Sequence, residues 1–242
     1  MTSPLLGEFL GTLVMILLGD GVVAAVLLKR SKAEGSGWMV ITTGWAFAVM
    51  AGVFVAVACG GEANLNPAIT LALAVRTGIY FKVFSFFAAQ LLGAMVGAAL
   101  VWLHYFPHWR ETPDSSAKLA CFCTAPAIRS FFPNLLSEII ATFVLVFVIG
   151  AIYSQRVFPN GPGPGFFAVY LVSSLVWGIG LSLGATTGYA INPARDLGPR
   201  IAHAILPVAG KGGSDWSYAP VPILGPLVGG ALAGLSLRLL NI

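Results

Sequence analysis

Charged side chains are scarce in this 242-residue chain. Asp, Glu, Lys and Arg make up 9% of the residues, whereas hydrophobic residues make up 57%. Soluble domains carry about 25% charged residues. A chain with so few cannot cover a surface that faces water, so we expect lipid around it. The net charge of +4 is small, and no basic cluster with interleaved aromatic residues accompanies it, so we predict no nucleic-acid partner.

Cysteine and histidine are also few, with three of each. Cys59, Cys121 and Cys123 contain no Cys-x-x-Cys pair, so the sequence predicts neither a disulfide framework nor a zinc site. The histidines show no spacing typical of a metal site or of a nucleophile and its base. We therefore expect no metal, no cofactor and no catalytic residues, and we do not expect an enzyme.

Long apolar segments dominate what remains. A membrane-spanning helix needs about 20 mostly apolar residues, and six segments qualify: 5–28, 38–59, 83–103, 135–153, 166–185 and 221–240. Two further apolar segments, 67–75 and 193–206, are too short to cross a membrane. The predicted fold class is an all-α membrane protein with six transmembrane helices and two re-entrant half-helices.

The order of these segments repeats, as two spans, a short segment and a third span in each half. Polar and small residues recur at matching places, and the pairs are Glu8 and Glu138, Thr12 and Thr142, Asn66 and Asn192, Gly93 and Gly225, Gly97 and Gly229. Three spans per half reverse the direction of the chain, which predicts an inverted internal repeat. We expect one channel domain, 1–242, built from repeats 1–104 and 131–242 and joined by a loop at 105–130.

Each short segment begins with Asn-Pro-Ala, at Asn66, Pro67 and Ala68 and again at Asn192, Pro193 and Ala194. Asn is a favoured helix N-cap and Pro a favoured first helical residue. Each motif should therefore open a half-helix, and an inverted repeat brings the two N-termini together near the membrane midplane. Their positive ends repel cations, while the NH2 groups of the two asparagines would face the pore and bind the oxygen of a neutral solute.

These paired motifs resemble the aquaporin (major intrinsic protein) family over essentially the whole chain. The Arg-Asp after the second motif, with Tyr105, Arg200 and Pro222, is similar to the glycerol-facilitator branch. The resemblance implies a homotetramer in a bacterial plasma membrane with cytoplasmic termini and a pore in each subunit. That pore would conduct glycerol and other small uncharged solutes, with some water, and exclude protons and ions.

The resemblance also implies a selectivity filter made of Trp45, Gly180, Tyr189 and Arg195. Trp and Tyr combine an apolar ring with a polar tip, which suits a carbon chain that bears hydroxyl groups. Arg offers a fork of donors for the hydroxyl oxygens. Gly180 would leave the space that a polyol needs. The filter is therefore expected to be amphipathic and wide.

Three acidic residues are expected to support the pore. Asp196 should hold the loop near Arg195, while Glu8 and Glu138 should accept N–H groups from the loops before the half-helices, which the bilayer leaves in need of partners. The alternative for Glu8 and Glu138 is a proton relay, which would make the protein a proton-coupled secondary transporter. A channel for another neutral solute, such as undissociated lactic acid or dihydroxyacetone, is the other alternative.

Two features depart from the family pattern. Asn64 stands where the family commonly has a histidine, and Glu62 adds a carboxylate beside it. Lys and Arg are also more numerous on the side that the family's orientation places outside, contrary to the positive-inside rule. The first departure leaves solute range and gating open, and the second leaves sidedness open.

Overall fold

The computed structural model describes residues 2–159 and 166–242, and all regular secondary structure in these ranges is helical. The helices in chain order are α1 (Pro4–Leu27), α2 (Trp38–Ala58), α3 (Pro67–Thr77), α4 (Val83–His104), α5 (His108–Glu111), α6 (Ser115–Ala120), α7 (Phe131–Ile152), α8 (Phe166–Ser182), α9 (Pro193–Ile205) and α10 (Pro220–Leu240). The segment predicted as a plain loop, 105–130, thus holds two short helices. The side chain of Asp114 caps α6 by accepting a hydrogen bond from the backbone N–H of Ser116, a local contact that favours one helical turn.

Within residues 2–159 and 166–242, five helices are long and apolar enough to cross a membrane: α1, α2, α4, α7 and α10. The sixth predicted span corresponds to α8, an apolar helix of 17 residues that begins where the described residues resume and packs against α2. α7 begins at Phe131 rather than at 135, because Pro133 lies in its first turn, where a missing N–H leaves no hydrogen bond unmade. The half-helices α3 and α9 each begin at the proline of an Asn-Pro-Ala motif.

Glycines bring the first and last spans of each half into backbone contact. A Cβ atom added to Gly93 of α4 would lie 2.2 Å from the carbonyl oxygen of Phe9 in α1. At the matching place in the other half, a Cβ on Gly229 of α10 would lie 2.4 Å from the carbonyl oxygen of Ile139 in α7. Small residues allow this approach in membranes, where apolar side chains gain nothing over lipid.

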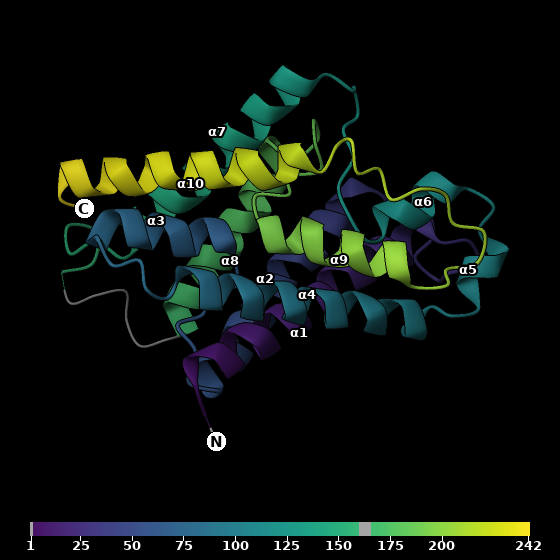
Figure 1. Cartoon of the computed structure of the whole chain (residues 1–242), viewed down its shortest axis with the longest axis horizontal. Coiled ribbons are helices and arrows are strands. Elements are labelled where there is room, and N and C mark those ends of the chain that lie inside the picture. The colour runs from purple at the N-terminus through teal and green to yellow at the C-terminus, as the bar shows by residue number, and fades with distance from the viewer. Residues whose placement is uncertain (1, 160–165) are drawn as a thin grey trace.

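Each half-helix packs against the last span of the other half, α3 on α10 and α9 on α4 (Figure 1). A Cβ on Gly234 of α10 would lie 2.4 Å from the carbonyl oxygen of Ala72 in α3. A Cβ on Gly198 of α9 would lie 2.6 Å from the Cβ of Ala94 in α4. This exchange ties the two halves together, and in Figure 1 α3 and α9 follow one another along the long axis of the molecule.

We predict that Gly93→Ala destabilises the protein by about 1–3 kcal/mol, the usual cost of overpacking, because the new methyl group meets backbone that cannot rotate away. Thermal unfolding in detergent measures this. The matched control is Gly178→Ala in α8, where an added Cβ has no neighbour within 4 Å among the described residues. A melting temperature of Gly93→Ala equal to that of the control would contradict the prediction.

Candidate functional site

The side chains of Asn66 and Asn192 cap the two half-helices. Oδ1 of Asn66 accepts a hydrogen bond of 2.8 Å from the backbone N–H of Ala68. Oδ1 of Asn192 accepts one of 3.0 Å from Ala194 and a longer one of 3.3 Å from Arg195. Each motif therefore satisfies N–H groups that the first turn of a helix leaves unpaired, and both asparagines are buried.

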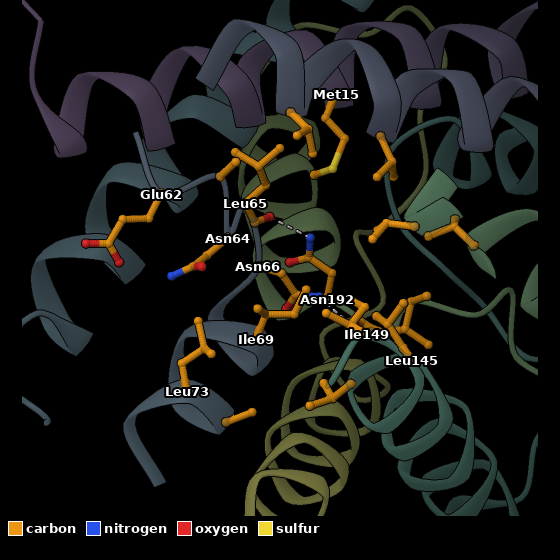
Figure 2. A pocket seen from close by; sticks show the side chains of 18 of the residues that line it. Met15, Glu62, Asn64, Leu65, Asn66, Ile69, Leu73, Leu145, Ile149 and Asn192 are labelled. Carbon is orange, nitrogen blue, oxygen red and sulfur yellow. Dashed lines mark hydrogen bonds between the residues drawn. The ribbon is translucent and has the colours of Figure 1, made fainter. Parts of the chain in front are cut away.

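The same two asparagines bind each other's loops, as Figure 2 shows for Asn192 and Leu65. Nδ2 of Asn66 donates to the carbonyl oxygen of Ile191 at 2.8 Å, and Nδ2 of Asn192 donates to that of Leu65 at 2.8 Å. We expected both NH2 groups to face the pore, but each group donates one of its two hydrogens to a backbone carbonyl of the opposite loop. These hydrogen bonds give the carbonyl groups of the two irregular loops partners that the lipid cannot supply. One hydrogen per amide remains for a solute.

The loops before the motifs have an unusual backbone conformation. Ala63 and Leu65 have φ angles of +58° and +52°, and Tyr189 and Ile191 have φ angles of +38° and +42°. Residues with side chains rarely adopt positive φ, and holding one there costs on the order of 1–3 kcal/mol. Such a conformation persists only when its surroundings fix it. Two buried carboxylates contribute to this.

Glu8 of α1 binds the first loop. Its carboxylate accepts hydrogen bonds from the backbone N–H groups of Asn64 at 2.9 Å and Leu65 at 2.8 Å. Gln90 of α4 donates its side-chain amide to the same carboxylate at 2.8 Å. The side chain of Glu8 therefore connects two spans to the loop that leads to Asn66.

Glu138 of α7 binds the second loop in the same way. It accepts hydrogen bonds from the backbone N–H groups of Ala190 at 3.0 Å and Ile191 at 2.9 Å, and from the hydroxyl of Thr187 at 2.6 Å. Both glutamates are fully buried, and neither is among the described residues that line the cavity below. Each carboxylate therefore satisfies N–H groups of the loop that leads to one half-helix.

A cavity of about 450 Å³ runs beside the two motifs, and Figure 2 shows part of its lining. Residues of both halves line it, and the polar ones include Glu62, Asn64, Asn66, Arg76, Asn192, Tyr189 and Arg195. Because Asn66 precedes α3 and Arg76 lies in its last turn, the cavity follows this half-helix along its length. Between the polar groups the lining is mostly apolar, with Leu73, Val172 and Ile149 among its members.

Three of the four expected filter residues line this cavity: Trp45, Tyr189 and Arg195. The Arg195 guanidinium carbon lies 4.2 Å from the centroid of the Trp45 ring, a cation–π contact. Each of the three also has a buried polar atom with no hydrogen-bond partner in the described part of the chain: Trp45 Nε1, Tyr189 Oη and Arg195 Nη1. Buried polar groups are rarely left unpaired without a reason.

Gly180 adjoins one of these three residues, Tyr189. It is not among the described residues lining the cavity, and a Cβ there would lie 3.0 Å from Cζ of Tyr189. Its missing side chain therefore makes room for the Tyr189 ring. Trp38 fixes this arrangement, because its Nε1 donates to the Gly180 carbonyl at 3.0 Å and its ring stands edge-on to Tyr189, 5.7 Å between centroids.

Asp196 binds the loop at Thr124. Its carboxylate accepts hydrogen bonds from the backbone N–H and the hydroxyl of Thr124, at 2.8 and 2.7 Å. Its cation is Arg200, whose Nε and Nη2 donate to it at 2.8 and 3.1 Å. The sequence pattern around the motif did not reveal this i,i+4 pair.

Sequence reasoning missed Asp20. This residue lies in α1, is fully buried, and places Oδ1 3.8 Å from Nη1 of Arg195. A signal was available, because a charged residue inside an apolar span marks a functional site by default. Among the described residues, by contrast, no group of three or more His, Cys, Asp or Glu side chains could hold a metal ion.

Comparison with known proteins places this geometry in a family. The model of the family "Major intrinsic protein" matches residues 2–237. The chain is 54% identical to glycerol uptake facilitator protein 3 of Lactiplantibacillus plantarum, over 99% of this chain and 98% of that protein. It is 55% identical to a probable glycerol uptake facilitator protein of Thermotoga maritima, over 95% of this chain and 96% of that protein.

A solved structure agrees with these relatives. The aquaglyceroporin from Plasmodium falciparum superposes with a TM-score of 0.84 and 28% identity, over 97% of this chain and 94% of that one. These matches are to channels, so the prediction that the chain is not an enzyme is confirmed. With its apolar helices and its bacterial relatives, it is a bacterial membrane protein with the aquaporin fold. The chain belongs to the major intrinsic protein family.

Proposed function

We propose that this protein is a passive channel that conducts glycerol and other small uncharged solutes, with some water, and excludes protons and ions. One observation carries the proposal: Trp45, Tyr189 and Arg195 line the cavity, and each has a buried polar atom without a partner among the described residues. Such atoms are satisfied when a hydroxyl-bearing solute passes. The relatives named glycerol uptake facilitators support the choice of solute.

The constriction formed by these three residues is amphipathic. The Trp45 and Tyr189 rings offer an apolar wall to the carbon chain, and the Arg195 guanidinium donates to hydroxyl oxygens. A solute that fits both exchanges its hydration for protein contacts at little cost. We assign Gly180 to the support of this constriction, since it accommodates the Tyr189 ring.

The midplane would exclude cations. The N-termini of α3 and α9 meet there, and each helix end is equivalent to about half a positive charge. Asn66 and Asn192 each keep one amide hydrogen after binding the opposite loop. A neutral oxygen is bound by these donors, whereas a cation meets two positive dipoles. The carboxylates of Glu8 and Glu138 are bound to loop N–H groups, and neither residue is among the described residues that line the cavity.

Proton-coupled transport is the weaker reading. It requires Glu8 or Glu138 to exchange protons with the pore, yet both carboxylates are held by backbone N–H groups.

We further propose a homotetramer in the plasma membrane with cytoplasmic termini. Exposed apolar side chains on the spans, such as Phe47, Leu92 and Leu232, supply surface for lipid and for neighbouring subunits.

Wild-type protein in liposomes should conduct glycerol well above protein-free vesicles, in proportion to the gradient and without saturation at low concentration. Stopped-flow light scattering measures this, with undissociated lactic acid and dihydroxyacetone as parallel solutes. No glycerol flux above the background would contradict the proposal, and uptake that follows a proton gradient would favour the transporter.

Trp45→Ala and Tyr189→Ala should each change the permeability of larger polyols relative to glycerol severalfold, because each removes one wall of the constriction. The control is Tyr170→Ala, since Tyr170 is an exposed aromatic residue of α8 outside the cavity. Relative permeabilities that stay unchanged in both filter variants would show that the filter lies elsewhere.

Asn192→Asp should admit cations. The carboxylate retains the capping oxygen but loses the NH2 group that binds the Leu65 carbonyl, and it puts a negative charge between two positive helix ends. Sodium leak into vesicles, followed with a potential-sensitive dye, measures the effect. A leak no greater than in wild type would contradict this account of cation exclusion.

A further inference from the structure

Asp20 is buried but has no role at the filter or at the Asn-Pro-Ala motifs. The free-energy cost of burying its carboxylate must therefore be offset by another group. Asp20 lies in the last two turns of α1, its side chain is 1% exposed, and neither carboxylate oxygen has a hydrogen-bond partner among the described residues. An isolated ionised carboxylate away from water is costly, and a nearby cation reduces that cost. Within the described chain, the cation within 4 Å of it is Arg195.

The buried guanidinium of Arg195 in turn needs an acidic partner. The Arg195 side chain is 8% exposed, and Nη1 has no hydrogen-bond partner in the residues described. The neighbouring carboxylate, Asp196, is already committed to Arg200 and Thr124. Among the described residues, Asp20 is therefore the acidic group placed within 4 Å of Arg195 to compensate its charge.

The residue before Asp20 supports the other side of the constriction. A Cβ on Gly19 would lie 2.4 Å from Cζ3 of Trp45, so the indole ring rests directly on the α1 backbone. Trp45 in turn faces the Arg195 guanidinium at 4.2 Å. Gly19 thus contacts Trp45, and Asp20 approaches Arg195, from the same turn of α1.

We propose that Asp20 is a positioning residue for solute selection. Its carboxylate holds the Arg195 guanidinium against the Trp45 ring and neutralises its charge, which fixes the width of the constriction and lets Arg195 act as a hydrogen-bond donor more than as a net positive charge. The inference rests on the proposed function, because it treats Arg195 as part of the filter.

The test compares glycerol with a larger polyol, erythritol, in liposomes that contain Asp20→Asn. This variant keeps the side-chain volume and removes the charge. Arg195 is then free to leave the Trp45 ring, and we expect the glycerol-to-erythritol permeability ratio to change severalfold. The matched control is Thr12→Val, because Thr12 is another fully buried polar residue of α1 whose hydroxyl has no hydrogen-bond partner among the described residues. It should keep the wild-type ratio.

A double-variant cycle separates positioning from a general effect on structure. In an Arg195→Ala background, Asp20→Asn should leave the permeability ratio unchanged, because the group on which Asp20 acts is gone. The melting temperature should respond as well. Arg195→Ala alone leaves Asp20 as an unpaired buried charge, so adding Asp20→Asn should raise the melting temperature, whereas Asp20→Asn in the wild-type background should lower it.

The outcomes distinguish this inference from the channel proposal. Absence of glycerol flux in wild type contradicts the channel proposal. Flux in wild type with an unchanged ratio in Asp20→Asn overturns the role of Asp20 alone. An equal change of the ratio in both backgrounds overturns action through Arg195. Should Asp20→Asn fail to fold by itself, the melting temperatures of the two Arg195→Ala variants decide, and a lower value for the double variant overturns the inference.

Discussion

Backbone polar groups inside a membrane have no water to bind, and the architecture of this protein follows from the way two irregular loops satisfy them. Glu8 and Glu138 bind the N–H groups before each motif. The amides of Asn66 and Asn192 bind the carbonyl groups of the opposite loop. Because every partner comes from another segment, neither loop can hold its positive φ angles alone. The crossed amide contacts therefore make each loop depend on the opposite half.

Glycine contacts make that assembly possible. Without a hydrophobic drive between helices in lipid, close backbone packing is the main source of association. The repeated glycines of α4 and α10 meet α1 and α7 at backbone distance, and Gly234 admits α3 from the other half. The half-helices are thereby held end to end, so that their N-termini meet beside the cavity instead of facing lipid.

Charge is arranged in pairs around the second motif. Asp196 pairs with Arg200 at hydrogen-bond distance, whereas Asp20 and Arg195 remain 3.8 Å apart with unpaired atoms on both sides. The tight pair ties α9 to the loop at Thr124, and the looser one leaves donors at the cavity. Burying a charge is costly unless it is compensated, and here compensation coincides with the place where a solute would be bound.

The sequence by itself determined the spans and the half-helices. It also showed that Glu8 corresponds to Glu138, and Asn66 to Asn192, in the two repeats. Apolar length, capping residues and repeat register can all be seen in the order of residues. Only the tertiary structure decided which groups the side chains contact or bind through hydrogen bonds. It showed the crossed amide contacts, the Tyr189 ring in the space beside Gly180 and the approach of Asp20 to Arg195. The amide contacts and the approach of Asp20 to Arg195 join residues more than a hundred positions apart. The contact of Tyr189 with Gly180 joins a loop to a helix whose rotation the sequence leaves open. These contacts depend on the distances between helices and loops and on the directions of their side chains, and the order of residues specifies neither directly.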